Sequence, residues 1–448
     1  MILNTDNALQ FIEKVNSAFS SAEISTRLNV SMSASEIITA LNLAFSSYQG
    51  RVEITTQMDA EDVISAVNQN VSLIGGVGNT IKFLHISDVH NSPDAITHCK
   101  TMMDADANIE ATILTGDYST GGTGIYSSVT TPMSSLGNKL LMLNGNHDVL
   151  NAFNNNQANA TAFLKSYVTD PSVEWGDSDN IASYWFRDYQ ITRTSKLRVI
   201  AIDSYEYNGI NEAISQFDTI YTQKQVNWII SRLMELSSTD FFIICLHEPP
   251  ANGTIAAGYS YNVSGKMDDD ILPMRRMNDF CSSRLWVWDS SLSNGVLLPK
   301  IVDAYVNRRS INTIVYNENS TYESNYTDNP SVSVNADFSA NTPATFLFYL
   351  GGHLHGDLAA YHPYFPSQLI LLVDCANPKT MGNSSDIGTR SSDTADGTRS
   401  NGILINEISL DFVNQMTTIK RVGQNAALSY NGFSAITRNS ISFPFVKQ

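Results

Sequence analysis

The sequence predicts an α/β protein preceded by a small α+β repeat module, and three features lead to this fold class. The first 75 residues repeat with a period of 26. From residue 80 onward, short apolar runs of strand length and strand composition end in polar residues of one chemical kind. The chain has 448 residues and is 42% hydrophobic, which is enough for large cores. We therefore expect two domains, at 1–75 and 76–448.

Each N-terminal repeat is interpreted as a short strand followed by an amphipathic helix, with strands expected at 28–32 and 52–58. Within each copy, apolar residues fall at i, i+1, i+4 and i+8, on one face of a helix. The helices are preceded by residue types that act as N-caps: Asn7, Ser33 and Asp59. Three further asparagines align in the repeat: Asn16, Asn42 and Asn68. An accidental run of helices would not match at these positions, so we predict three stacked units that serve attachment or oligomerisation.

Composition excludes several classes of protein. The formal net charge of −17 disfavours broad binding to nucleic acid. No apolar run approaches the roughly 18 residues of a membrane span. The first residues lack the basic and apolar regions of a signal peptide, so we expect a cytoplasmic or virion-associated protein. The four cysteines form no CxxC pair, and buried free thiols are expected at Cys245 and Cys375 rather than a zinc site.

Five apolar runs end in side chains that can bind metal. The runs at 81–86, 111–114, 140–143, 241–246 and 346–350 lead into Asp88 and His90, Asp117, Asn146, His247, and His353 and His355, respectively. Open α/β sheets place their ligands at the carboxyl ends of strands, so these side chains should meet. Imidazole and carboxylate suit Mn, Fe, Zn or Ni, and we favour Mn. Seven ligands fit two divalent ions about 3.5–4 Å apart that share a carboxylate.

The order of these blocks resembles the signature of the calcineurin-like metallophosphoesterase family. The five blocks are Asp88-Val89-His90, Gly116-Asp117, Gly145-Asn146-His147-Asp148, His247 and Gly352-His353-Leu354-His355. The resemblance extends over residues 80–430 or so and leaves the N-terminal repeat outside. It implies a two-sheet sandwich flanked by helices and a phosphate-ester substrate.

The resemblance also implies a role for each residue. Asp117 would bridge two ions, with the ligand sets Asp88, His90 and His355 for one ion and Asn146, His247 and His353 for the other. His147 would face the substrate and protonate the leaving oxygen or stabilise the phosphoryl group, and Asp148 would orient His147. A water shared by two cations is hydroxide near neutral pH and can attack phosphorus in line, while the metals offset the developing charge.

We expect hydrolysis of phosphate mono- or diesters by this metal-bridged hydroxide, with a cell-surface polymer among the candidate substrates. One alternative is a structural component of a phage tail or other particle that retains the fold and attaches, or forms a homo-oligomer, through residues 1–75. A further alternative is a nuclease, although Arg275-Arg276 and Arg308-Arg309 are the only basic clusters that favour one.

Other polar residues are interpreted as structural. We expect His85, His98 and His362 not to bind metal, and Asp203 to be structural. Glu248 stands where the family more often has a small or apolar residue, so it is expected to support the ligands or to shape specificity. Residues 251–344 exceed what one crossover needs. This inserted region, with Trp286 and Trp288, is expected to help set substrate choice.

Overall fold

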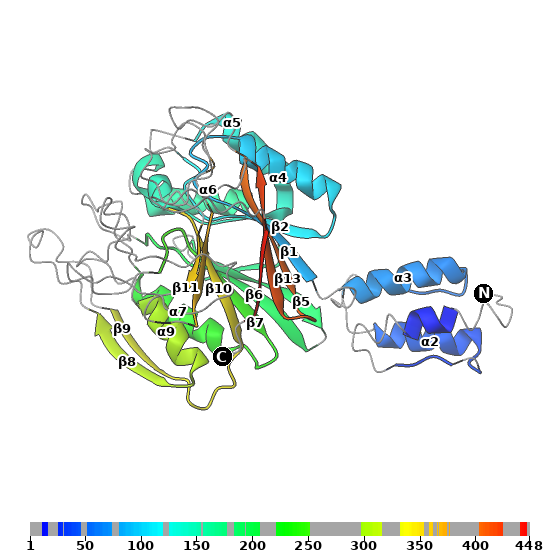
Figure 1. Ribbon diagram of the computed structural model, residues 1–448. Helices are drawn as coiled ribbons and strands as arrows, with labels where there is room; N and C mark the ends of the chain where they lie inside the picture. The colour runs from blue at the N-terminus through cyan, green and yellow to red at the C-terminus, as the bar shows by residue number, and fades with distance from the viewer. Residues whose placement is uncertain are drawn as a thin grey trace, which may run out of the picture. The chain divides into compact units, whose positions relative to one another are not determined.

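The computed structural model divides the chain into two compact units (Figure 1). The first contains residues 1–80 with 188–197 and 411–414, and the second contains the rest. The structure describes residues 11–16, 26–29, 31–45, 52–73, 80–119, 125–153, 156–176, 183–192, 194–206, 221–250, 297–315, 332–353, 358–361, 365, 367–373, 376, 403–423 and 440–445. Several predictions fall outside this set, namely those for His355, His362, Cys375, Trp286, Trp288, Arg275, Arg276 and Asn7.

The N-terminal unit contains the predicted amphipathic helices. Residues 11–16 are helical, and they are followed by α2 (Ala34–Ala44) and α3 (Ala60–Leu73). The predicted N-cap Ser33 forms a capping box with Glu36, which satisfies two backbone N–H groups at the start of α2. The apolar faces meet in one core made of Phe11, Ile12, Val15, Leu28, Ile37, Leu41, Phe45, Ile54, Val63, Ala66 and Val67.

The short strands expected in the repeats are wrong, because the described residues of 28–32 and 52–58 adopt turns and irregular backbone. Asparagine side chains take the place of a neighbouring strand. Asn42 donates from Nδ2 to Ile54 O at 2.7 Å and accepts from Ile54 N at 2.9 Å. Two further pairs bond in the same way, Asn16 with Leu28 and Asn70 with Val52. One primary amide thus satisfies both backbone polar groups of one residue, so no strand ladder is needed.

The second unit is built on two large sheets, which confirms the predicted two-sheet α/β fold. The first sheet has the order β15 (Ser440–Pro444), β14 (Met416–Gly423), β13 (Leu404–Asp411), β1 (Thr80–Ile86), β2 (Ile109–Leu114) and β3 (Leu140–Met142). The second has the order β11 (Leu358–Tyr361), β12 (Leu369–Leu372), β10 (Thr345–Gly351), β7 (Phe241–Cys245), β6 (Ser195–Ala201), β5 (Trp185–Thr192) and β4 (Val173–Trp175). The strands β8 (Ser310–Val315) and β9 (Val332–Asp337) pair antiparallel and form a separate two-stranded sheet.

Helices cover the two sheets (Figure 1). They are α4 (Asp94–Ala105), α5 (Ser127–Leu136), the short η1 (Gly137–Lys139), the π-helical η2 (His147–Ala152), α6 (Gln157–Tyr167), α7 (Gln223–Met234) and α9 (Leu297–Val306). The faces of α7 and α9 pack on β7 and β10 in one core cluster, where Ile229, Ile301, Tyr305 and Phe242 are fully buried. In the described part of the inserted region, α9, β8 and β9 therefore contribute apolar residues to this core.

Parallel pairing brings the functional strand ends together. In the first sheet β1 pairs with β2 and β2 with β3, all parallel. In the second sheet β10 is parallel to both β7 and β12. Parallel strands end at the same edge, so each sheet presents its loops as one cluster. Among the described helices, none combines the length and the apolar character that crossing a membrane requires.

Candidate metal centre

The carboxyl ends of five strands deliver six of the seven predicted metal ligands. Asp88 and His90 follow β1, Asp117 follows β2, Asn146 follows β3, His247 follows β7 and His353 follows β10. All six are buried, with exposed fractions of 3% or less. His147, the predicted substrate-facing residue, retains a side-chain exposure of 23%. The ligands are thus withdrawn from water, while His147 stays accessible.

The ligand-bearing loops hold an unusual backbone conformation. Asp88, His90, Asp117 and His353 have φ values of +52°, +42°, +53° and +67°. Non-glycine residues rarely adopt this region, and such strain concentrates at functional sites. The loops after β1 and β2 support each other, because Asp88 N–H donates to Gly116 O at 3.1 Å and His90 N–H donates to Asp117 O at 3.0 Å.

Two positions of the predicted blocks require glycine because atoms of neighbouring residues approach them closely. Gly116 has φ of +97°, and a Cβ there would lie 2.6 Å from His247 Nδ1. A Cβ on Gly352 would overlap Ser87 Oγ and Asp88 Oδ2. A side chain at either position would displace a ligand residue, which explains why the blocks read Gly-Asp and Gly-His.

Backbone carbonyls fix the tautomers of two histidines. His247 Nδ1 lies 2.7 Å from Thr115 O, and His90 Nδ1 lies 2.9 Å from Ser119 O. A carbonyl oxygen only accepts, so Nδ1 carries the hydrogen in both rings. Nε2 is left to face the centre, as metal-binding histidines require.

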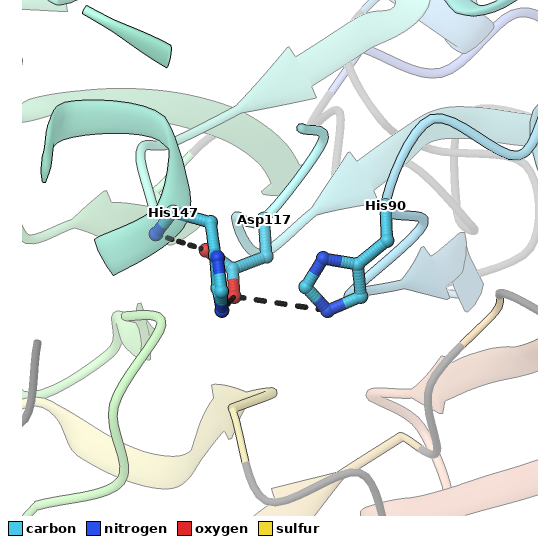
Figure 2. A group of neighbouring side chains, drawn as sticks. All are labelled: His90, Asp117 and His147. Atoms are coloured by element: carbon cyan, nitrogen blue, oxygen red, sulfur yellow. Dashed lines mark hydrogen bonds and ion pairs between the residues drawn. The ribbon is translucent and has the colours of Figure 1, made fainter. Parts of the chain in front are cut away.

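Two groups of potential ligands share Asp117. One contains His90, Asp117 and His147, and the other contains Asp117, His247 and His353, with the ligand atoms of each group within 4.8 Å of one another. Asp117 Oδ2 lies 3.3 Å from His247 Nε2 and 3.9 Å from both His90 Nε2 and His147 Nε2 (Figure 2). One carboxylate at the junction of two groups is the arrangement that a bridging ligand needs.

The donor set fits a divalent cation. Asn146 Oδ1 lies 3.1 Å from His247 Nε2 and 3.2 Å from His353 Nδ1. Two imidazole nitrogens and an amide oxygen thus point at one region beside the Asp117 carboxylate, and this mixture of nitrogen and oxygen atoms suits first-row divalent ions. The residues present can therefore hold a metal.

Electrostatics in the centre favour positive charge. Burial lowers the pKa of His247, but Asp117 and then Asp88 outweigh burial and raise the pKa to about 10. Burial alone would raise the pKa of Asp117, but His247 and then His147 hold it well below its usual value. The carboxylates thus stabilise a positive charge at His247 Nε2, and a bound cation meets the same demand.

Asp148 acts on the backbone of the site. Its carboxylate accepts from the N–H groups of Asp117 and Gly145, both at 2.8 Å, and of Ser119 at 3.0 Å. Burial and then the charge of Asp117 raise its pKa. The described bonds of Asp148 therefore run to the loops after β2 and β3. His147 is tied to the same loops, since its N–H donates to Asp117 Oδ1 at 2.9 Å.

The residues expected to be structural lie in buried or helical settings. His85 Nε2 is 3.0 Å from Thr115 Oγ1, and His98 lies on α4. Cys99 and Cys245 are buried free thiols, as predicted for Cys245. Sequence reasoning gave no role to Tyr205, whose ring lies beside His247 with a centroid separation of 6.0 Å. The apolar-run criterion could not find it, because a tyrosine after a strand is not a metal ligand.

The fold and the centre define a metal-dependent hydrolase, and comparison of the sequence with known families supports this class. Residues 81–277 match the family model described as calcineurin-like phosphoesterase, and this similarity supports a hydrolase that acts on phosphate esters. The match includes the first four predicted blocks and ends before Gly352, so it is shorter than the range expected from the motifs. It does not include the N-terminal repeat.

Solved structures that resemble this chain do so at low sequence identity and with TM-scores below 0.5, and they include the following three. The structure of PhoD is 11% identical, with 82% of this chain and 70% of that chain covered and a TM-score of 0.41. A hypothetical protein from Thermus thermophilus is 11% identical, with coverages of 82% and 100% and a TM-score of 0.33. A novel phosphatase from Mycoplasma pneumoniae is 10% identical, with coverages of 82% and 95% and a TM-score of 0.33. No curated protein matches the sequence.

Proposed function

We propose that the protein is a dinuclear metal-dependent phosphoesterase that hydrolyses phosphate mono- or diesters. The proposed bridging ligand is Asp117. The proposed ligand sets are Asp88, His90 and His355 for one ion and Asn146, His247 and His353 for the other. Manganese is the favoured metal among Mn, Fe, Zn and Ni, since the centre combines carboxylates with imidazoles.

One observation carries this proposal: a buried carboxylate, Asp117, belongs to both groups of potential ligands. Two supporting features are the Nδ1–H bonds of His90 and His247 to carbonyls, which leave Nε2 for the metal. His355 lies outside the described residues, and its role rests on the Gly-His-x-His block alone.

When bound, two divalent ions would lower the pKa of a shared water and offset charge on the phosphoryl oxygens. The chain itself supplies the remaining functions. His147 is the accessible imidazole, and its ring stands edge-on to that of His90 with centroids 5.0 Å apart. From there it can give a proton to the leaving oxygen, which would otherwise depart as a poor alkoxide. Asp148 would hold His147 through the shared backbone rather than through its ring.

Hydrolysis of bis-p-nitrophenyl phosphate and p-nitrophenyl phosphate with added Mn²⁺ tests this function. We expect metal-dependent turnover that falls at least ~100-fold in Asp117→Asn and in His147→Ala. Matched controls are Asp106→Asn, at a carboxylate that pairs with Lys82, and His98→Ala on α4. Turnover that is equal with and without metal, or that survives in Asp117→Asn, would refute the metal mechanism.

We further propose that residues 1–75 attach the enzyme to a particle or to further copies of the chain, as in a phage tail component. The support is a separate apolar core in this unit, with no residue of the metal centre in it. Sedimentation of the full-length chain beside a variant lacking 1–75 tests the idea. We expect the variant lacking 1–75 to lose association and to keep its turnover. The same state of association in both proteins would contradict the proposal.

A further inference from the structure

The end of β6 lies beside the strand ends that deliver two of the proposed ligands. Ile202 N–H donates to Cys245 O at 2.8 Å, and Leu246 N–H donates to Leu350 O at 2.9 Å. The ends of β6, β7 and β10 are therefore neighbours. The segment 203–206 follows β6 at the edge where His247 follows β7, yet it belongs to none of the five blocks.

Hydrogen bonds from neighbouring elements hold this segment in place. The Asp203 carboxylate, which is fully buried, accepts from Gln157 Nε2 at 2.6 Å, from Ser183 Oγ and from Tyr205 N at 2.9 Å. The backbone N–H of Asp203 donates to Gln225 Oε1 at 2.8 Å, and the backbone carbonyl of Asp203 accepts from Gln225 Nε2 at 2.9 Å. Side chains from α6 and α7 thus fix the backbone on which Tyr205 stands.

Tyr205 reaches from this anchor to His247. Its side chain is fully buried, and its ring lies 6.0 Å from the His247 ring at an interplanar angle of 55°. Its hydroxyl donates to Glu248 Oε2 at 3.3 Å, in the residue that directly follows His247. Tyr205 therefore contacts both the proposed ligand and the next residue of its loop.

The imidazole of His247 needs such a neighbour. Its bond to Thr115 O holds the Nδ1 side of the ring, and rotation about the Cβ–Cγ bond would break this bond and turn Nε2 away from the centre. Packed rings restrict this rotation, and two rings are in place: Tyr205, and His353 with centroids 5.1 Å apart. A ligand that is already oriented loses less freedom when the metal binds, so its affinity for metal is higher.

We propose that Tyr205, with its ring held in place by the hydroxyl bond to Glu248, is a positioning residue that fixes the ring of His247 for metal binding, an inference that rests on the proposed metal centre. Groups that orient a ligand typically change metal affinity by about 10–100-fold. The hydroxyl bond also gives the buried Glu248 carboxylate a function in the loop that holds His247.

Titration of metal-stripped, full-length protein with Mn²⁺ tests the proposal, with the affinity of each site measured by calorimetry. We expect Tyr205→Phe to weaken one of two sites about tenfold, and its turnover to return to the wild-type value in excess Mn²⁺. Tyr305→Phe is the matched control, because Tyr305 is also fully buried and also loses one bond, to Ala344 N. The control should keep wild-type affinity.

The outcomes separate the two levels of inference. Wild-type protein that binds no Mn²⁺ would overturn the metal centre itself. Equal Mn²⁺ affinities of the wild-type protein and Tyr205→Phe would overturn only the role of Tyr205. If Tyr205→Phe does not fold, Glu248→Ala removes the same bond from its other partner, and unchanged affinity in that variant would equally overturn the role.

Discussion

At the scale of single residues, the centre combines strained backbone with dense hydrogen bonding. Each non-glycine residue at positive φ costs about 1–3 kcal/mol, and Asp88, His90, Asp117 and His353 all hold this conformation. Bonds between the loops after β1 and β2 offset part of that cost. The residues that would hold metal are therefore positioned by their neighbours rather than by their own conformational preference.

Asp148 is the largest of these supports, because its carboxylate accepts three buried backbone N–H groups. Asp148→Ala should lower the free energy of unfolding by about 3 kcal/mol or more, since each unsatisfied buried donor is costly. Urea unfolding measures the change. The control Asp104→Ala removes an exposed carboxylate that pairs with Lys100 and should shift stability by less than about 1 kcal/mol. Equal effects in both variants would refute this role of Asp148.

Glu206 should make stability depend on pH. Burial and then Asp203 raise its pKa from 4.5 to about 8, and Thr222 and Gln225 only partly oppose this. The folded state therefore favours the protonated form, so the contribution to stability is complete below pH 4.5 and is lost as pH rises towards 8. Glu206→Gln should be stabilised relative to wild type more at about pH 8 than at about pH 5, by a few kcal/mol at most. A difference that is constant between the two pH values would contradict the prediction.

Sequence reasoning could place the ligand residues but not their supports. The ligands Asp88, Asp117 and His247 follow apolar runs of strand length, so a local pattern marks them. The bonds of Asp148 to distant backbone N–H groups and the packing of Tyr205 on His247 arise only when strands far apart in sequence become neighbours. Such contacts leave no local pattern.

At the scale of elements, the repeats show how a side chain can replace a strand. Alternating apolar residues at 28–32 and 52–58 predicted strands, but the asparagines of the preceding or following helices satisfy the peptide groups of Leu28, Ile54 and Val52 instead. The repeated asparagine was visible in the sequence for Asn16 and Asn42, whereas the third described bridge comes from Asn70, two residues after the aligned Asn68. The partners were not visible, because Asn42 and Ile54 are 12 residues apart. Helix periodicity is local and was therefore predicted correctly.

The Asn42 bridge should be a measurable source of stability in the N-terminal unit. Asn42→Leu leaves the N–H and C=O of the buried Ile54 without their partner and should cost about 1–3 kcal/mol. Amide hydrogen exchange at Ile54 should accelerate strongly. Thr39→Ala is the control, because its hydroxyl bonds only within exposed α2, and Ile54 should exchange as in wild type. Protection of Ile54 that survives in Asn42→Leu would show that the bridge does not hold the segment.

At the scale of the whole molecule, the described residues form separate apolar cores. One core contains only residues between Phe11 and Val67, and another surrounds β7 and β10 in the second unit. Every proposed metal ligand belongs to the second unit. Binding stabilises only the structure that forms the site, so metal should act on one unit and leave the other unchanged.

Thermal unfolding should therefore show two transitions with different responses. Mn²⁺ at about 100 times its dissociation constant should stabilise the metal-binding unit by about 2.7 kcal/mol and raise only its transition temperature. Leu41→Ala removes a fully buried side chain from the N-terminal core and should reduce the free energy of unfolding of that unit by about 2–5 kcal/mol. Only the transition temperature of the N-terminal unit should therefore fall. Calorimetry of the full-length chain with and without Mn²⁺ measures both shifts. A single transition that moves with both Mn²⁺ and Leu41→Ala would mean that the two units unfold as one cooperative structure. The N-terminal unit would then contribute to the stability of the metal-binding unit and would not be an independent attached module.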